Sequence, residues 1–151
     1  MHVEPGSLRG RVGVITGADS AAGQAIARGL AAEGMSLMLI ARPGAHVRGL
    51  AEELAHMYAI RCFPASLDVT DPDAVERILM HAEQHVGAVD VLVNTVPGRV
   101  TRALLPTMTQ RGRGHVANLA PAPHVAVPPP ITVANVTEPV ELVDAVVASF
   151  T

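Results

Sequence analysis

A glycine-containing turn near the N-terminus combines the residue types that bind phosphate. The turn covers residues 16–23 (TGADSAAG) and lies between an apolar run and an amphipathic stretch. A turn from a strand into a helix presents backbone N–H groups and the positive end of the helix dipole, and both attract anions. Glycine is also required in tight turns that bind nothing. The motif by itself therefore leaves open a phosphate site and a purely structural turn.

Polar residues after three further apolar runs favour the phosphate site. Arg42 directly follows the second run, where a cation can pair with a ribose 2′-phosphate and a carboxylate would instead bind the free hydroxyl. Asp68 and Val69 follow the third run, and Asn94 ends the fourth. The carboxyl ends of parallel strands lie along one edge of an open α/β sheet, where such sheets bind ligands. The spacing therefore predicts a dinucleotide site at this edge.

The hydrophobic pattern predicts strands and helices that alternate along the chain. Five apolar runs have the length of strands and cover residues 11–15, 36–40, 60–67, 89–94 and 115–119. Four amphipathic stretches have helical period and cover residues 21–33, 47–57, 71–86 and 99–111. This alternation indicates a parallel sheet with right-handed crossovers. We expect one Rossmann-like, doubly wound α/β domain, residues 1–151, with a sheet of about six strands.

The pattern changes after the fifth predicted strand. Residues 120–130 (APAPHVAVPPP) contain five prolines and cannot form the interior of a helix. An extended linker of this length spans about 34 Å, whereas a return along a neighbouring strand needs only about 20 Å. We therefore expect a sixth parallel strand at residues 131–136 and a closing helix at residues 140–150. Asp71 would cap the third helix and Thr137 the last one.

The composition limits the classes of function. With 49% hydrophobic residues, 17% charged residues and a net charge of −3, the chain is too apolar for a disordered protein and too acidic for a nucleic-acid partner. No apolar run approaches the roughly 18 residues of a membrane span, and the first residues lack a signal-peptide core. We expect a cytoplasmic protein with no membrane partner. Its abundant Ala, Arg, Gly and Pro without Lys indicate a GC-rich bacterial source.

Other reactive side chains are predicted to serve structure. Cys62 is the only cysteine, which excludes an internal disulfide and a cysteine-based zinc site, and it is expected to pack in a strand. His81 and His85 have a spacing that can bind a metal, but no third ligand is evident, so no metal site is predicted. His124 could protonate an alkoxide, although an exposed loop histidine is the commoner case. Core positions are expected for Leu50 and Leu54 and for four methionines, Met35, Met38, Met57 and Met80.

Taken together and in order, the motifs resemble those of the short-chain dehydrogenase/reductase family. The family's TGxxxGxG turn appears as TGADSAAG at residues 16–23, and its DVTD segment stands at residues 68–71. The family's DVLVNNAG appears as DVLVNTVP at residues 90–97, and its LLPxMxxRGxGxIVNISS as LLPTMTQRGRGHVANLAP at residues 104–121. Ala21 replaces the middle glycine of the first motif, and Thr95-Val96-Pro97 replaces Asn-Ala-Gly in the third.

The resemblance implies a cofactor site and assigns residues to it. NADP(H) is favoured over NAD(H), because Arg42 would select the 2′-phosphate. Asp68 and Val69 would flank the adenine, and Asn94 would support the cofactor ribose. The pyrophosphate and the adenosine ribose would be surrounded by Gly17, Asp19, Ser20, Ala22 and Gly23.

The family's catalytic residues have no counterparts in this chain. The family uses a Tyr as general acid and base, a Lys that lowers the pKa of that Tyr, a Ser and an Asn. The chain has no lysine, and its one tyrosine, Tyr58, is predicted at the start of the third strand, opposite the ligand edge. Pro121 stands at the position of the Ser, and no asparagine occurs between Asn94 and Asn118. A phenol needs a neighbouring cation to act near neutral pH, so we predict no catalytic residue.

Three hypotheses follow from these observations. The chain is an oxidoreductase-like NAD(P)(H)-binding member of the family, for which the resemblance implies hydride transfer between NADP(H) and a carbonyl or alcohol. Alternatively it is an inactive pseudoenzyme, a dinucleotide-binding or regulatory module that self-associates or pairs with a full-length relative. In the family a helix carries the Tyr and the Lys, and the proline-rich residues 120–130 stand in its place here. Its loss should leave Val116, Leu119 and Ile131 on an under-covered apolar face, which favours such pairing. A truncated product with no function of its own is a third reading.

Overall fold

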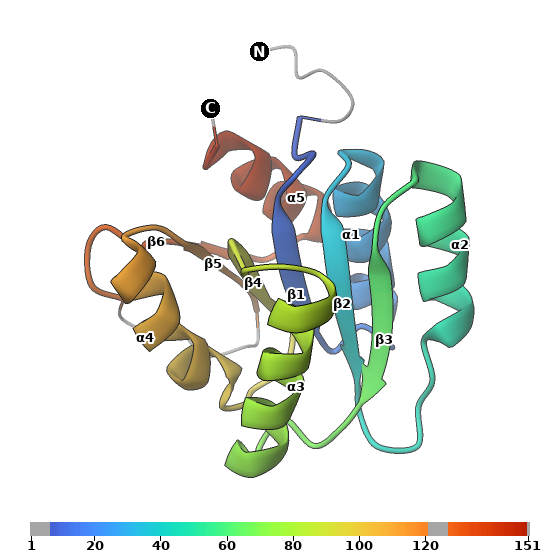
Figure 1. Ribbon diagram of the computed structural model, residues 1–151. Coiled ribbons are helices and arrows are strands. Elements are labelled where there is room, and N and C mark those ends of the chain that lie inside the picture. The colour runs from blue at the N-terminus through green and yellow to red at the C-terminus, as the bar shows by residue number, and fades with distance from the viewer. Residues whose placement is uncertain (1–6, 121–126, 151) are drawn as a thin grey trace.

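The computed structural model describes residues 7–120 and 127–150. Six parallel strands form one sheet in the order β3-β2-β1-β4-β5-β6, with helices on both faces (Figure 1). The strands are β1 (Val12–Thr16), β2 (Ser36–Ala41), β3 (Cys62–Ser66), β4 (Val91–Asn94), β5 (His115–Leu119) and β6 (Thr132–Val136). The helices are α1 (Ala21–Ala32), α2 (Arg48–Tyr58), α3 (Pro72–His85), α4 (Val100–Arg111) and α5 (Pro139–Ala148). The predicted doubly wound α/β fold is confirmed.

The two faces of the sheet carry two separate apolar cores. Helices α1, α2 and α5 pack on one face, where Ile26, Leu54 and Val146 meet the side chains of Ile15 and Leu39. Helices α3 and α4 cover the other face through Val75, Leu79, Val100, Leu104 and Met108. Successive residues of a strand point to opposite faces, so β1 contributes Ile15 to the first core and Val14 to the second. Burial on both faces explains why these strands are continuous apolar runs.

Capping residues fix where two of the helices begin. The Asp71 carboxylate accepts hydrogen bonds from the backbone N–H groups of Asp73 and Ala74 at 3.0 and 3.4 Å, as the sequence predicts. The Ser20 hydroxyl accepts a hydrogen bond from the Gly23 N–H at 3.0 Å and begins α1. The predicted cap at Thr137 is wrong, because the N-cap of α5 is the next residue, Glu138, and Pro139 is the first residue of the helix.

The sixth strand lies parallel to the fifth, as predicted. His115 is in register with Thr132, and Leu119 is in register with Val136. Between α4 and α5, the described residues 112–120 and 127–138 contain no helix. Pro121 and His124 lie outside the described residues.

The predicted under-covered face is not found. Val116 is fully buried, and Leu119 and Ile131 are each 5% exposed. Val116 and Ile131 belong to the core beneath α4, and Leu119 to the core beneath α5. The exposed apolar side chain in this region is Val133 of β6, which is 39% exposed.

Three further expectations about packing are wrong. Met57 and Met80 are each 58% exposed, although Met35 and Met38 are buried as predicted. Helix α2 buries Ala51 and Leu54 against the sheet, which turns Met57 toward solvent. Tyr58 is the last residue of α2 and not the first of β3.

Cys62 does lie in β3, and its burial raises the pKa of the thiol to about 12.

None of the described helices has the length and apolar character needed to cross a membrane.

Candidate functional site

A cavity of about 480 Å³ opens at the carboxyl edge of the sheet, where β1, β2 and β3 end. We call it the carboxyl-edge cavity. Six of the nine cofactor residues predicted from the sequence line it: Gly17, Asp19, Ser20, Arg42, Asp68 and Val69. Ala22, Gly23 and Asn94 do not line it. The remaining lining residues are Ile40, Ala41, Pro43, Leu67, Thr70, Val96 and Pro97.

The turn between β1 and α1 is built around two close approaches. Gly17 has a φ of +64°, and a Cβ at this position would overlap the hydroxyl oxygen of Thr95. The Thr95 hydroxyl is held in place because it donates to the Thr16 carbonyl oxygen at 2.8 Å. At the other end of the turn, a Cβ on Gly23 would overlap the carbonyl oxygen of Gly17 and lie 2.8 Å from the Ala18 Cα. Both glycines are therefore required for the turn itself.

Ser20 closes the same turn from inside. Its hydroxyl donates to the Gly17 carbonyl oxygen at 2.8 Å and accepts from the Gly23 N–H at 3.0 Å. The first backbone N–H groups of a helix have no partner within the helix, and those of α1 begin at Ala21 and Ala22. Ala21 is exposed. The start of α1 thus offers unpaired donors and a positive dipole end beside the cavity.

Arg42 stands at the rim of the cavity. Its Nε lies 3.1 Å from Asp19 Oδ2, and its backbone N–H donates to Asp19 Oδ1 at 3.3 Å. The Arg42 side chain is 80% exposed, whereas that of Asp19 is 17% exposed. Because the ion pair uses Nε, the two terminal nitrogens of the guanidinium remain on the solvent side as donors for an anion.

Asp68 lies across the cavity from the turn. Its Oδ1 accepts hydrogen bonds from the Thr70 N–H at 2.9 Å and the Thr70 hydroxyl at 2.6 Å. These two bonds lower the pKa of the Asp68 carboxyl, which is therefore ionised at neutral pH. Oδ2 is not used in either bond and can accept a hydrogen bond from a ligand.

The Asn94 side chain belongs to a hydrogen-bonded row near the ends of three strands. Its side-chain NH₂ donates to Thr101 Oγ1 at 2.7 Å and to Asn118 Oδ1 at 3.0 Å. Asn118 in turn donates to Asn135 Oδ1 at 3.0 Å. The three asparagines are in register across β4, β5 and β6 and form a row that points toward α4. The structure therefore does not bring the Asn94 side chain to the cavity.

Several lining residues were missed by the sequence reasoning. Pro43, Leu67 and Thr70 are immediate neighbours of residues that were singled out, and the signal was their position at the same strand ends. Val96 and Pro97, which differ from the residues of the family pattern, also line the cavity. The asparagine row could have been found from the repeated Asn near the ends of three strands, in VLVN, HVANL and TVANV.

The remaining catalytic and metal candidates lie elsewhere. Tyr58 ends α2 and precedes β3, which places it at the amino edge, away from the cavity. The rings of His81 and His85 lie 4.1 Å apart on α3. Within residues 7–120 and 127–150, no cluster of three or more His, Cys, Asp or Glu could hold a metal ion.

Comparison with known proteins identifies a family for this chain. The sequence profile of the short chain dehydrogenases matches residues 11–100. A short chain dehydrogenase of Pseudocercospora fijiensis is 28% identical over 143 residues, which are 76% of this chain and 46% of that relative. The chain thus spans about half the length of that curated relative.

Solved structures share the fold. The L-sorbose reductase of Gluconobacter frateurii, crystallised with NADPH and L-sorbose, superposes with a TM-score of 0.68 at 27% identity, over 78% of this chain and 54% of the reductase. A metagenomic short-chain oxidoreductase in complex with NADP gives a TM-score of 0.78 at 22% identity, over 96% of this chain and 92% of the other. With the profile covering most of the sheet and the glycine turn in place, this chain belongs to the short chain dehydrogenase family of oxidoreductases.

Proposed function

We propose that this chain binds NADP(H), with the adenosine end of the cofactor in the carboxyl-edge cavity and the 2′-phosphate paired with Arg42. The observation that carries the proposal is the exposed guanidinium of Arg42 at the rim of a cavity lined by the glycine turn and by Asp68. A cation at this position complements a 2′-phosphate, whereas NAD(H) is recognised there by a carboxylate. The L-sorbose reductase of Gluconobacter frateurii, which has the same fold, was crystallised with NADPH.

The residues of the turn fit a pyrophosphate. Gly17 and Gly23 have no side chains to block the approach, and the Ser20 hydroxyl is already satisfied by the turn. The unpaired N–H groups at the start of α1 supply the donors that a pyrophosphate needs. Ala21, which stands where the family has glycine, is exposed.

The far wall of the cavity fits an adenine ring. Val69 and Leu67 offer apolar contact, and the free Oδ2 of the ionised Asp68 can accept a hydrogen bond from the exocyclic amine. Asp68 is thereby assigned to recognition of the base and not to catalysis.

The side of the site beyond the adenosine differs from the family pattern. Pro97 has no backbone N–H, so this segment has one donor fewer to offer a cofactor. Asn94, expected to support a ribose, is proposed to act indirectly by fixing the end of β4 through Thr101 and Asn118.

We propose that this chain's own residues do not support hydride transfer to a substrate. A bound nicotinamide supplies the hydride, but proton transfer to the substrate oxygen needs an acid of suitable pKa beside it. The chain has no lysine, and Tyr58 belongs to the opposite edge of the sheet. We propose a dinucleotide-binding pseudoenzyme, and turnover would require residues that this sequence does not contain.

Calorimetric melting with saturating NADPH and then NADH tests this function, because the chain has no tryptophan for fluorescence quenching. NADPH at 100-fold its dissociation constant should add about 2.7 kcal/mol of stability, which raises the melting temperature by roughly 5–10 °C. NADH should give a much smaller shift. The absence of a shift with both cofactors would contradict cofactor binding. NADPH oxidation above a protein-free blank, with any of a panel of carbonyl compounds, would contradict the pseudoenzyme assignment.

A second candidate function, self-association, is favoured by the edge of the sheet. Strand β6 ends the strand order, and the side chain of Val133, its second residue, is 39% exposed. Edge strands present unpaired backbone groups that a second copy can extend. Sedimentation velocity should detect a dimer that Val133→Lys abolishes, whereas Val140→Lys on α5, at a valine that is 73% exposed, should leave it intact. A wild-type chain that stays monomeric up to millimolar concentration would exclude this function.

A further inference from the structure

A second pocket lies at the opposite edge of the sheet from the cofactor cavity. It has a volume of about 420 Å³ and is found where β1, β4 and β5 begin. The side chains that matter for its chemistry are Arg11, Asp90, Arg113, His115, Thr132 and Phe150. We call it the amino-edge pocket. A concave site of this volume is within the range that holds a small molecule.

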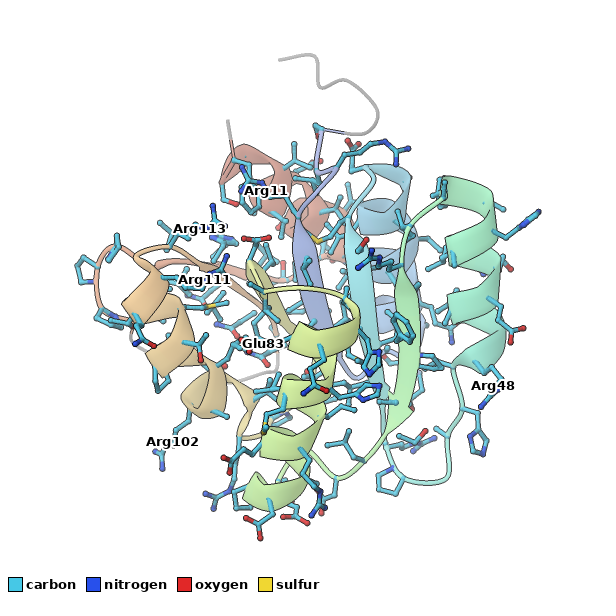
Figure 2. All side chains as sticks on the ribbon, viewed as in Figure 1. Arg11, Arg48, Glu83, Arg102, Arg111 and Arg113 are labelled. Carbon is cyan, nitrogen blue, oxygen red and sulfur yellow. The ribbon has the colours of Figure 1, made fainter. Side chains whose placement is uncertain are left out.

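Three arginines gather at this pocket. Figure 2 shows Arg11, Arg111 and Arg113 together at the end of the molecule where the strands begin, whereas Arg48 and Arg102 lie toward the opposite end. Asp90 is the one carboxylate among the residues that line the pocket. Arg111 does not line the pocket, but it pairs with Asp90, so the charges of Arg11 and Arg113 are left unbalanced in a chain whose net charge is −3. The local charge is therefore opposite in sign to that of the whole chain.

Asp90 and Arg111 stabilise the fold through hydrogen bonds. Asp90 Oδ2 accepts a hydrogen bond from the Val12 N–H at 2.9 Å, and Asp90 is only 5% exposed. Arg111 donates through Nη1 to the Val89 carbonyl oxygen at 2.9 Å, and its Nη2 lies 3.4 Å from Asp90 Oδ1. These bonds join the start of β1, the start of β4 and the end of α4. Asp90 and Arg111 therefore form a structural pair.

Arg11 and Arg113 keep guanidinium N–H groups that these contacts do not use. Arg113 contacts Asp90 only loosely, with Nε 3.8 Å from Oδ1, and its side chain is 60% exposed. The guanidinium of Arg11 lies over the Phe150 ring, 4.6 Å from its centroid. Among residues 7–120 and 127–150, no carboxylate forms an ion pair with Arg11. A ring face fixes the plane of a guanidinium but uses none of its N–H groups, so both side chains can donate to an anion.

His115 borders the pocket, but neither of its ring nitrogens is free to contact a ligand there. It lines the pocket and is 6% exposed, and its Nδ1 is 2.7 Å from Thr132 Oγ1. Its Nε2 is buried and has no hydrogen-bond partner among the described residues. Burial also lowers the pKa of His115, so the imidazole is neutral and does not add to the positive charge.

We propose that the amino-edge pocket binds the phosphoryl group of a small phosphorylated molecule, held by Arg11 and Arg113. Arginine binds phosphate through paired N–H donors. The dianion of a phosphoryl group matches the two unbalanced positive charges, whereas a carboxylate would leave one of them unpaired. The ligand sits across the sheet from the dinucleotide site, so the proposal does not depend on the function proposed for that site.

Titration of the ¹⁵N-labelled chain with inorganic phosphate, followed by amide chemical shifts, tests the proposal. The ionic strength is held constant with sodium chloride, and the pH is kept above the second pKa of phosphate. We expect saturable shifts at the amides of Gly112, Arg113, Gly114 and His115. Phosphate that binds only at the glycine turn would instead shift Gly17 and Ser20, and would overturn the proposal. Sodium acetate that shifts the same pocket amides with equal affinity would also overturn it.

Substitutions separate binding by the pocket from general charge attraction. Arg113→Gln and Arg11→Gln should each weaken the apparent phosphate affinity at the pocket amides by about tenfold. Arg102→Gln removes the same charge from an exposed position on α4 and should leave the affinity unchanged. The Arg113 side chain is largely exposed, so Arg113→Gln should not disturb the fold. It therefore tests the site even if Arg11→Gln disturbs the packing on Phe150. An Arg113→Gln chain that binds phosphate as tightly as the wild type would disprove the assignment.

Discussion

Replacing Arg42 by Asp is expected to weaken NADPH binding about 100-fold, equivalent to about 2.7 kcal/mol, while changing NADH binding by less than about threefold. The substitution removes charge-assisted hydrogen bonds to the 2′-phosphate, each of which contributes about 1.5–3 kcal/mol. It also places a second carboxylate next to Asp19, so the 2′-phosphate would meet repulsion where it now meets a cation. NADH has a free 2′-hydroxyl, which can donate a hydrogen bond to an aspartate at this position.

Titration calorimetry with both cofactors measures this change in preference. The stability of the fold should change little, because the Arg42 side chain is 80% exposed and an exposed ion pair contributes about 0–1 kcal/mol. Arg102→Asp reverses the same charge on an exposed residue of α4 that does not line the cavity, and it serves as the control. If Arg42→Asp weakens NADPH and NADH by the same factor, Arg42 does not read the 2′-phosphate.

The arrangement of the sheet could be predicted because hydrophobic pattern and parallel topology leave few alternatives. The apolar runs that became β1 to β5 differ from the observed strands by at most two residues at either end. Once the strands are parallel, every residue that ends a strand lies at one edge. This is why Gly17, Arg42 and Asp68 could be placed at a common cavity without knowledge of any contact.

The direction of side chains could not be predicted in the same way. Asn94 does end β4, but strand alternation turns its amide toward α4, where Thr101 and Asn118 bind it. Met57 lies one helical turn after Leu54, yet the orientation of α2 buries Ala51 in its place. Val116 and Ile131 are buried in the same core as Leu104 and Met108 of α4, where the sequence predicted an under-covered face. The errors at Met57, Val116 and Ile131 concern packing between elements, which depends on three-dimensional contacts and not on local pattern.

Replacing Gly23 by Ala is expected to lower the free energy of unfolding by about 3 kcal/mol, and the melting temperature by roughly 6–12 °C. An alanine within a helix normally stabilises it by about 0.5–1 kcal/mol relative to glycine. At Gly23 the new Cβ would overlap the carbonyl oxygen of Gly17 and lie 2.8 Å from the Ala18 Cα. Both are backbone atoms, so relief requires α1 to move away from the turn. The same movement would separate the first N–H groups of α1 from the cavity and weaken NADPH binding.

Gly49→Ala in α2 is the matched control, because it makes the same chemical change with the opposite expected sign. A Cβ at Gly49 would meet nothing within 4 Å, so the helical preference of alanine acts alone and should stabilise the chain by about 0.5 kcal/mol. Chemical denaturation of the two variants beside the wild type measures both effects. If Gly23→Ala is as stable as the wild type or more stable, the turn can move to accept the new Cβ at no cost in free energy. The close contact between α1 and the Gly17 carbonyl oxygen would then not explain the glycine at this position. A loss of stability at Gly23 with a gain at Gly49 would show that the turn, and not helix propensity, requires glycine at the start of α1.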